Sequence, residues 1–245
     1  MDFYRPNKTK EPLPCIIVIQ GGGFLPQNGQ RFKPFAEHVA NNGFATALIS
    51  YRGSPEHQHA NTLADLRASL AYLRDNRKAL GIDPERIGAT GRSAGGTLAA
   101  LLAENEGPAD APIRIQAAVC FAGVFDFVAR FTDKEQLALQ PKHEAKIKTN
   151  GAWIGTPFSP NVQEWLGASA INHIDAQDAP TLFIHAKNDS TVPWQQSRDM
   201  HRAMLKAGIA SEIKLYDTGG HGVRPKGEQP LDEMVAFFIK QFGKE

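Results

Sequence analysis

Short, continuous apolar runs alternate along the chain with longer segments in which apolar residues recur at helical spacing. Most of the runs are rich in Val, Ile, Ala and Leu, which is typical of strands covered on both faces. Six strands are predicted, at 14–20, 45–50, 86–90, 115–121, 181–186 and 212–216. Five helices are predicted, at 31–41, 60–80, 93–104, 195–207 and 229–241. Because strands alternate with helices, we expect an α/β fold with a mostly parallel, doubly wound sheet.

The alternation breaks between about residues 126 and 172. This stretch has a charged part, 142–148, and an aromatic part rich in Gly and Pro, 153–165. A compact domain rarely carries so long an irregular segment without a purpose. We therefore expect a single domain over 1–245 with an irregular insert or cap over the carboxyl ends of the strands. The alternative is a peripheral structural excursion.

The most informative motif is the pentapeptide Gly91-Arg92-Ser93-Ala94-Gly95, which lies between a predicted strand and a predicted helix. A Gly-x-Ser-x-Gly sequence on a strand-to-helix turn is typical of a nucleophile elbow. Glycine is needed at both outer positions because a Cβ atom there would collide with neighbouring backbone. The pattern predicts Ser93 as a nucleophile at a helix N-terminus, where developing negative charge is favoured. The alternative is an ordinary glycine-rich junction.

A serine nucleophile needs a base, and the base needs an acid that orients it. In elbow hydrolases these residues follow one another in the order Ser, acid, His. His221 lies among glycines after the last predicted strand and is the candidate base. Asp189 follows the strand 181–186 and is the candidate acid. Asp217 is the competing candidate because it is closer to His221 in sequence.

Ester cleavage also needs hydrogen-bond donors for the oxyanion of the tetrahedral intermediate. Three consecutive glycines follow the first core strand, and their backbone can turn amide groups toward a ligand. The N–H groups of Gly22, Gly23 and Ala94 are the predicted donors. A glycine run alone also fits a phosphate-binding loop, but no Gly-Lys-Ser/Thr sequence follows this one.

Composition excludes several classes of partner. The chain is 42% hydrophobic and 22% charged with a net charge of +1, which gives no electrostatic basis for nucleic-acid binding. No apolar run is long enough for a membrane span. The first residues lack the apolar core of a signal peptide, so we expect a cytoplasmic protein as the sequence stands, or a secreted one if a leader is missing. Cys15 and Cys120 lie in predicted strands and are expected to be buried thiols.

Taken together, the motifs resemble those of α/β-hydrolases. The chain is similar to small esterases such as bacterial feruloyl and acetyl-xylan esterases and the hormone-sensitive-lipase group. The matching segments are Tyr4–Pro6, Gly21–Phe24, Tyr51–Glu56, Asp65, Gly81–Ile87, Ser93–Gly96, the His185, Asp189, Val192 and Pro193 set, and Gly220–Gly222. The resemblance implies a triad of Ser93, Asp189 and His221 and no cofactor. Gln20 departs from the family, which usually has His there, and Arg92 replaces an acidic or small residue.

The leading hypothesis is a serine esterase that cleaves short acyl or aryl esters, including esters on carbohydrate, through an acyl-enzyme. Its partner is then a small-molecule or saccharide ester, with the oligomeric state open. Candidate substrate contacts are Phe24, Trp153, Trp165 and Trp194, for each of which core packing is the favoured alternative, and Arg92, for which the alternative is a surface salt bridge. The competing functions are an amidase, aryl-formamidase or peptidase on the same scaffold, and a non-catalytic binding module. No metal site is expected, because His57 and His59 have no second ligand cluster beside them.

Overall fold

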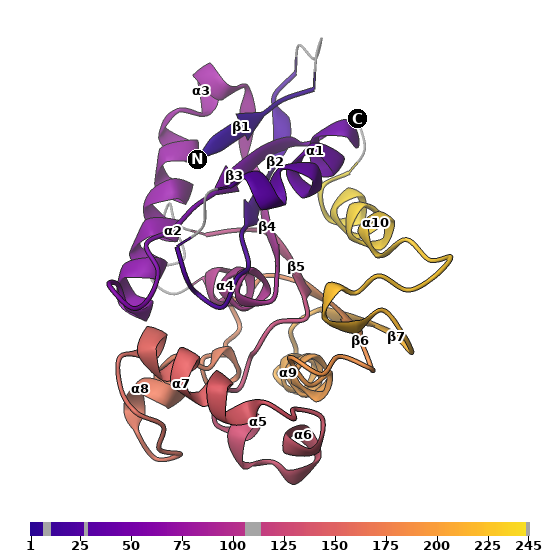
Figure 1. The fold of residues 1–245 in the computed structure, drawn as a ribbon. Helices are drawn as coiled ribbons and strands as arrows, with labels where there is room; N and C mark the ends of the chain where they lie inside the picture. Colours follow the sequence, from indigo (N-terminus) through magenta and orange to yellow (C-terminus); the bar gives the residue numbers. More distant parts are fainter. Residues whose placement is uncertain (7–10, 27–28, 106–113, 244–245) are drawn as a thin grey trace.

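A seven-stranded sheet in the order β1-β3-β2-β4-β5-β6-β7 organises the computed structural model, which describes residues 1–6, 11–26, 29–105 and 114–243 (Figure 1). The strands are β1 Asp2–Tyr4, β2 Leu13–Ile19, β3 Ala45–Ile49, β4 Ile82–Arg92, β5 Ala117–Phe121, β6 Thr181–Ala186 and β7 Ser211–Tyr216. All neighbouring pairs are parallel except β1 with β3. The predicted doubly wound, mostly parallel sheet is confirmed.

Helices cover both faces of the sheet (Figure 1). The main ones are α1 Lys33–Asn41, α2 His59–Asp75, α4 Ala94–Ala103, α9 Gln195–Lys206 and α10 Pro230–Phe242. Successive residues of β2 point to opposite faces: Ile17 packs with α2 and α4, and Ile16 packs with α1 and α10. Both faces of the sheet are therefore buried, which explains why its strands read as continuous apolar runs. Cys15 and Cys120 are free and buried, as expected.

The helix expected over 60–80 is divided into α2 and the short α3, Arg77–Leu80. Asn76 separates them, and Gly81 ends α3 in the left-handed conformation at φ 63°. Glycine adopts this conformation without the steric cost of a Cβ atom. The stop predicted at this glycine is therefore where the helix ends.

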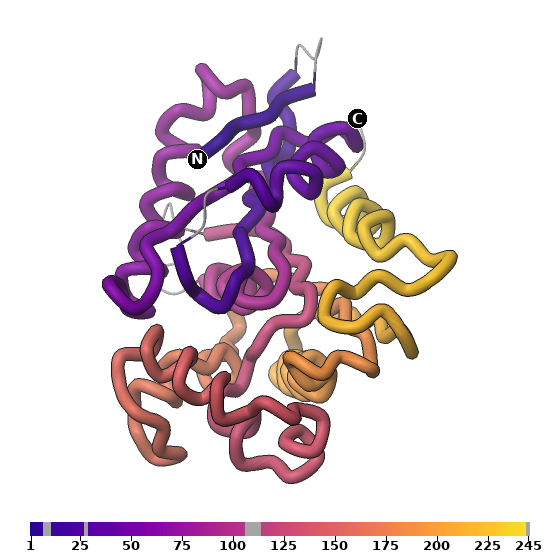
Figure 2. The backbone as a smooth tube through the Cα atoms, viewed as in Figure 1, coloured from indigo at the N-terminus to yellow at the C-terminus, as the bar shows by residue number. Residues whose placement is uncertain are grey.

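The segment 126–172 differs from its description as irregular, because short helices make up most of it. They are α5 Ala129–Thr132, α6 Lys134–Ala138, α7 His143–Ile154, α8 Gln163–Gly167 and the 3-10 turn Ala170–Asn172. In the tube view these helices form the lower part of the molecule (Figure 2). The ring of Trp153 in α7 stacks on Phe24, with centroids 3.8 Å apart. The insert therefore packs directly on the loop that follows β2.

Candidate active site

Ser93 occupies the sharp turn between β4 and α4, with φ 59° and ψ −124°. A Cβ atom on Gly91 would lie 2.4 Å from the carbonyl oxygen of Gly95, and one on Gly95 would lie 2.2 Å from that of Ile19. No side chain fits at either position, so the turn requires both glycines. The Ser93 N–H donates to the carbonyl of Phe121 at 2.8 Å. The sequence motif therefore folds into the sharp strand-to-helix turn that the sequence predicts.

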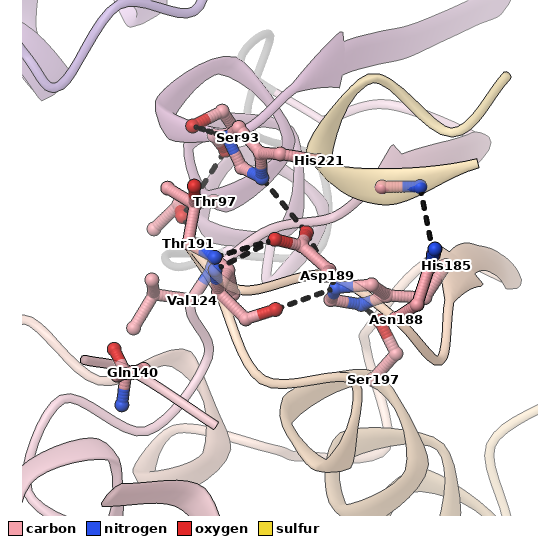
Figure 3. Close-up of polar contacts among 12 residues, drawn as sticks. Ser93, Thr97, Val124, Gln140, His185, Asn188, Asp189, Thr191, Ser197 and His221 are labelled. Atoms are coloured by element: carbon pink, nitrogen blue, oxygen red, sulfur yellow. Dashed lines mark hydrogen bonds and ion pairs between the residues drawn. The ribbon is translucent and has the colours of Figure 1, made fainter. Parts of the chain in front are cut away.

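Three loops bring Ser93, His221 and Asp189 together (Figure 3). Ser93 Oγ lies 2.8 Å from His221 Nε2, and His221 Nδ1 lies 2.8 Å from Asp189 Oδ2. Ser93 follows β4, Asp189 follows β6, and His221 follows β7 in the turn Gly220–Gly222. Carboxyl ends of parallel strands meet at one edge of the sheet, which explains how residues 128 positions apart come into contact.

Asp189 is almost completely buried, with an exposed fraction of 1%. Its Oδ1 accepts hydrogen bonds from the N–H groups of Thr191 and Val192, at 2.7 and 3.0 Å. Its Oδ2 lies 3.2 Å from His185 Nε2 in addition to the contact with His221. Burial by itself would raise the pKa of Asp189, but hydrogen bonds from the two histidines and their charges hold it well below the usual range. The carboxylate is therefore kept ionised beside the imidazole.

The competing acid, Asp217, is directed elsewhere. Its side chain is 84% exposed and pairs with Lys187, with Nζ 2.8 Å from Oδ1. That ion pair lowers the pKa of Asp217. The geometry therefore brings Asp189, and not Asp217, to the imidazole.

The loop after β2 is shaped by three consecutive residues with positive φ: Gly22 at 130°, Gly23 at 66° and Phe24 at 64°. The buried Gln20 side chain supports this loop, since its amide oxygen accepts a hydrogen bond from the Gly29 N–H at 3.0 Å. Among the described residues, the Gly22 and Gly23 amides donate to no other group. Ala94, the first residue of α4, has the unpaired N–H of a helix N-terminus. All three predicted oxyanion donors are therefore available to a ligand.

The aromatic residues require a correction. Trp153 and Trp165 are fully buried and Phe24 is 2% exposed, so these three side chains present almost no surface to a substrate. The indole N–H groups of the two tryptophans are also engaged, that of Trp153 by the Thr62 hydroxyl at 3.1 Å. These residues form the core of the insert, and only the half-buried Trp194 remains as an aromatic candidate for substrate contact.

Arg92 is also largely enclosed. Its guanidinium carbon lies 5.7 Å from the ring centroid of Phe35 and 5.6 Å from that of Phe121. Burial, together with the nearby charge of Arg224, lowers the pKa of Arg92 to about 10. The Arg92 side chain therefore packs against two aromatic rings, whereas the sequence predicted a substrate contact or a surface salt bridge.

Two supporting residues were not recognised in the sequence. Asn188 Oδ1 accepts the Gly220 N–H at 2.8 Å and so joins the acid loop to the histidine loop. Arg130, buried in the insert, donates to the carbonyl oxygen of Thr191 at 2.6 Å. Asn188 could have been suspected from its position beside Asp189, whereas nothing in the sequence singles out Arg130.

Two further properties bear on what the site can do. Within the described ranges, no three His, Cys, Asp or Glu side chains are grouped so that they could hold a metal ion. No helix in the same ranges is both long and apolar enough to cross a membrane.

A cavity of about 540 Å³ opens beside helix α7. It is lined by Pro55, Gln58, Glu144, Ile147, Lys148, Gly151, Ala152, Gly155, Thr156, Pro157 and Phe158. None of the three candidate catalytic residues is among these lining residues.

Known proteins with similar sequences and folds include esterases. The chain is 34% identical over 193 residues to the probable carboxylic ester hydrolase LipM of Mycobacterium tuberculosis, covering 76% of this chain and 43% of the relative. The chain spans about half the length of the curated relatives it matches.

Among solved structures, the acetyl ester-xyloside bifunctional hydrolase of Caldicellulosiruptor lactoaceticus superposes with a TM-score of 0.80 at 26% identity, covering 97% of this chain and 86% of that one. Esterase 2 of Thermogutta terrifontis, solved phosphonylated by sarin, gives a TM-score of 0.77 at 25% identity, covering 97% and 88%. The fold is therefore that of α/β-hydrolase esterases. The model of the BD-FAE family matches residues 1–204, and the chain belongs to that family.

Proposed function

We propose that the protein is a serine carboxylesterase in which Ser93 is the nucleophile, His221 the base and Asp189 the orienting acid. The observation that carries the proposal is the unbroken pair of 2.8 Å contacts from Ser93 Oγ through the imidazole to the buried carboxylate. A non-catalytic binding module has no need of this arrangement. The esterase relatives and neighbours support the same reaction.

In the proposed mechanism, Ser93 Oγ attacks the ester carbonyl as His221 Nε2 takes its proton. The resulting oxyanion is stabilised by the N–H groups of Gly22 or Gly23 and Ala94. The tetrahedral intermediate then collapses: the bond from the carbonyl carbon to the alkoxide oxygen breaks, His221 gives its proton to that oxygen, the alcohol leaves, and the acyl group remains on Ser93 Oγ. Water, deprotonated by the same imidazole, attacks the acyl group and releases the acid and free Ser93.

Asp189 contributes orientation and charge. By accepting a hydrogen bond from the Nδ1–H group it fixes the tautomer whose Nε2 is free to receive a proton, and it stabilises the imidazolium that forms. Because the pKa of this carboxyl lies well below its usual range, its support does not depend on a second titration near neutral pH.

The proposed substrates are short acyl or aryl esters, including acetyl esters on carbohydrate. Support comes from neighbours described as an acetyl ester-xyloside hydrolase and a carbohydrate esterase. The insert that packs on Phe24 is proposed as a cap over the oxyanion loop. Trp194, half-buried beside Arg198, is the proposed aromatic contact for the ester.

A substrate panel tests the proposal. p-Nitrophenyl esters from acetate to decanoate, acetylated and feruloylated saccharides, and matched p-nitroanilides would be compared, with Ser93→Ala as the control. We expect fast hydrolysis of p-nitrophenyl acetate, slow hydrolysis of the anilide, and no effect of EDTA. Faster cleavage of the anilide would indicate an amidase instead. Activity that EDTA abolished and zinc restored would rule out the serine mechanism.

A further inference from the structure

A second histidine lies against the carboxylate of Asp189, on the side opposite His221 (Figure 3). His185 is in β6 and is completely buried. Its Nε2 lies 3.2 Å from Asp189 Oδ2 and 3.0 Å from the carbonyl oxygen of Val192. Its Nδ1 lies 2.8 Å from the hydroxyl oxygen of Ser197 in α9.

These partners determine where His185 carries a proton. Both neighbours of Nε2 are acceptors, a carboxylate and a carbonyl, so Nε2 must be the donor in either charge state of the ring. The Ser197 hydroxyl can donate to Nδ1 or accept from it, and so it satisfies that nitrogen in both states. His185 Nε2–H therefore always donates to Asp189 Oδ2, and Ser197 holds the ring at Nδ1.

We propose that His185, held by Ser197, is a positioning residue that orients the Asp189 carboxylate toward His221. The inference rests on the proposed function, because it takes Asp189 as the orienting acid. His185 touches no reacting atom of Ser93 and acts only through Asp189 and the Val192 carbonyl.

The geometry supports two effects. First, Asp189 Oδ1 binds the N–H groups of Thr191 and Val192 while His185 binds the carbonyl of Val192, so the turn 189–192 is held from both sides. Second, the His185 N–H competes with the His221 N–H for the same oxygen, Oδ2. That competition limits how strongly the carboxylate stabilises the His221 imidazolium.

Two cations also act on this carboxylate, at longer range than the histidines. They are Arg130 from α5 and Lys146 from α7. In the described part of the chain, the Arg130 guanidinium hydrogen-bonds to Gln140, Asn150 and the Thr191 carbonyl rather than to the carboxylate itself. Replacing His185 therefore removes a direct donor to Asp189 and leaves these two cations in place.

The test replaces His185 with Leu, which has no donor, and with Gln, which keeps an N–H at the end of the side chain. For His185→Leu we expect kcat to fall about tenfold with KM little changed, because the residue does not contact substrate. We also expect the acid limb of kcat/KM to move to higher pH, because Oδ2 then binds the imidazolium more strongly. His185→Gln should restore part of kcat and move the acid limb part of the way back toward its wild-type position.

A matched control is available on helix α9, which also carries Ser197. His201 Nδ1 lies 2.9 Å from the hydroxyl of Ser211, which is a second His–Ser pair with no contact to the triad. His201→Leu should leave the pH profile unchanged. All rates would be divided by the concentration of active enzyme, measured by titrating the active sites with a fluorophosphonate. Partial unfolding is then not mistaken for slow turnover.

The outcomes separate the inference from the proposed function. If wild-type turnover requires Ser93 but His185→Leu keeps the wild-type kcat and pH profile per active site, the positioning role is wrong. If wild type does not hydrolyse esters, the proposed function itself fails. Should His185→Leu not fold, Ser197→Ala decides, since releasing the tether should move the acid limb in the same direction by a smaller amount, and an unmoved limb would overturn the inference.

Discussion

Replacing Asp189 with Asn tests the role of the orienting acid, because it changes only one carboxylate oxygen into an NH₂ group. The carboxylate accepts two backbone N–H groups at Oδ1 and two imidazole nitrogens at Oδ2. An amide has only one acceptor oxygen. If that oxygen keeps the bonds to Thr191 and Val192, the NH₂ group faces His221 Nδ1, which must then be unprotonated. The His221 proton moves to Nε2, where it blocks transfer from Ser93.

The alternative rotamer of the introduced amide directs its NH₂ group at the two backbone donors and disrupts the turn, so neither orientation preserves the base. A mis-set tautomer of this kind lowers turnover by ~10⁴ in a serine protease, the known precedent. At ~1.4 kcal/mol per factor of ten, this is about 5 kcal/mol of transition-state stabilisation. We expect a loss of the same order for Asp189→Asn.

The assay is kcat/KM for p-nitrophenyl acetate, normalised to folded protein by circular dichroism. Asp217→Asn is the matched control, because Asp217 is exposed and paired with Lys187 rather than with His221. We expect it to stay within about twofold of wild type. Retention of a tenth of wild-type activity by Asp189→Asn, or a larger loss in Asp217→Asn, would refute the assignment of the acid.

Titration and stability measurements provide three further tests. Because the pKa of Asp189 is held well below its usual range, kcat/KM should fall on the acid side as one proton binds to His221, and a two-proton limb above pH 5 would contradict this. Burial raises the pKa of Asp178 to about 7, because the ionised carboxylate is destabilised in the folded state. This cost to the free energy of unfolding is absent below the pKa of the unfolded chain, grows as the pH rises toward 7, and is constant at higher pH. Asp178→Asn should therefore raise the free energy of unfolding by about 2 to 4 kcal/mol at pH 8 and by little at pH 4, as measured by urea titration. Arg130→Met removes the buried donor to the Thr191 carbonyl and should lower the free energy of unfolding by about 3 kcal/mol while reducing kcat; unchanged stability would argue against this tie between insert and acid loop.

The sheet and the approach of Ser93, His221 and Asp189 to one another were predictable because their signals are local. Most core strands are continuous apolar runs, and Ser93, Asp189 and His221 each lie beyond the carboxyl end of a strand. The Gly-x-Ser-x-Gly pattern is likewise contained in five consecutive residues, although the backbone that excludes a side chain at Gly95 belongs to β2. Chain order then distinguishes the base and acid from other residues of the same type.

The remainder depends on neighbours distant in sequence. Strand β1 has three residues, too few for a period to appear, and it exists because it pairs with β3. The insert helices are short and are fixed by packing around Trp153 and Trp165. Residue type alone left both core packing and substrate contact open for these rings, and the contact of His185 with Asp189 forms only once β6 and its loop are folded.

Reaction with a fluorophosphonate, followed by peptide mass spectrometry, tests the assignment of the nucleophile most directly. We expect one phosphonyl adduct per chain, on Ser93, with loss of p-nitrophenyl acetate hydrolysis in proportion to labelling. Ser93→Ala should fold, take no label and show no turnover. An adduct on a different serine, or full ester turnover in Ser93→Ala, would contradict the assignment of Ser93 as the nucleophile.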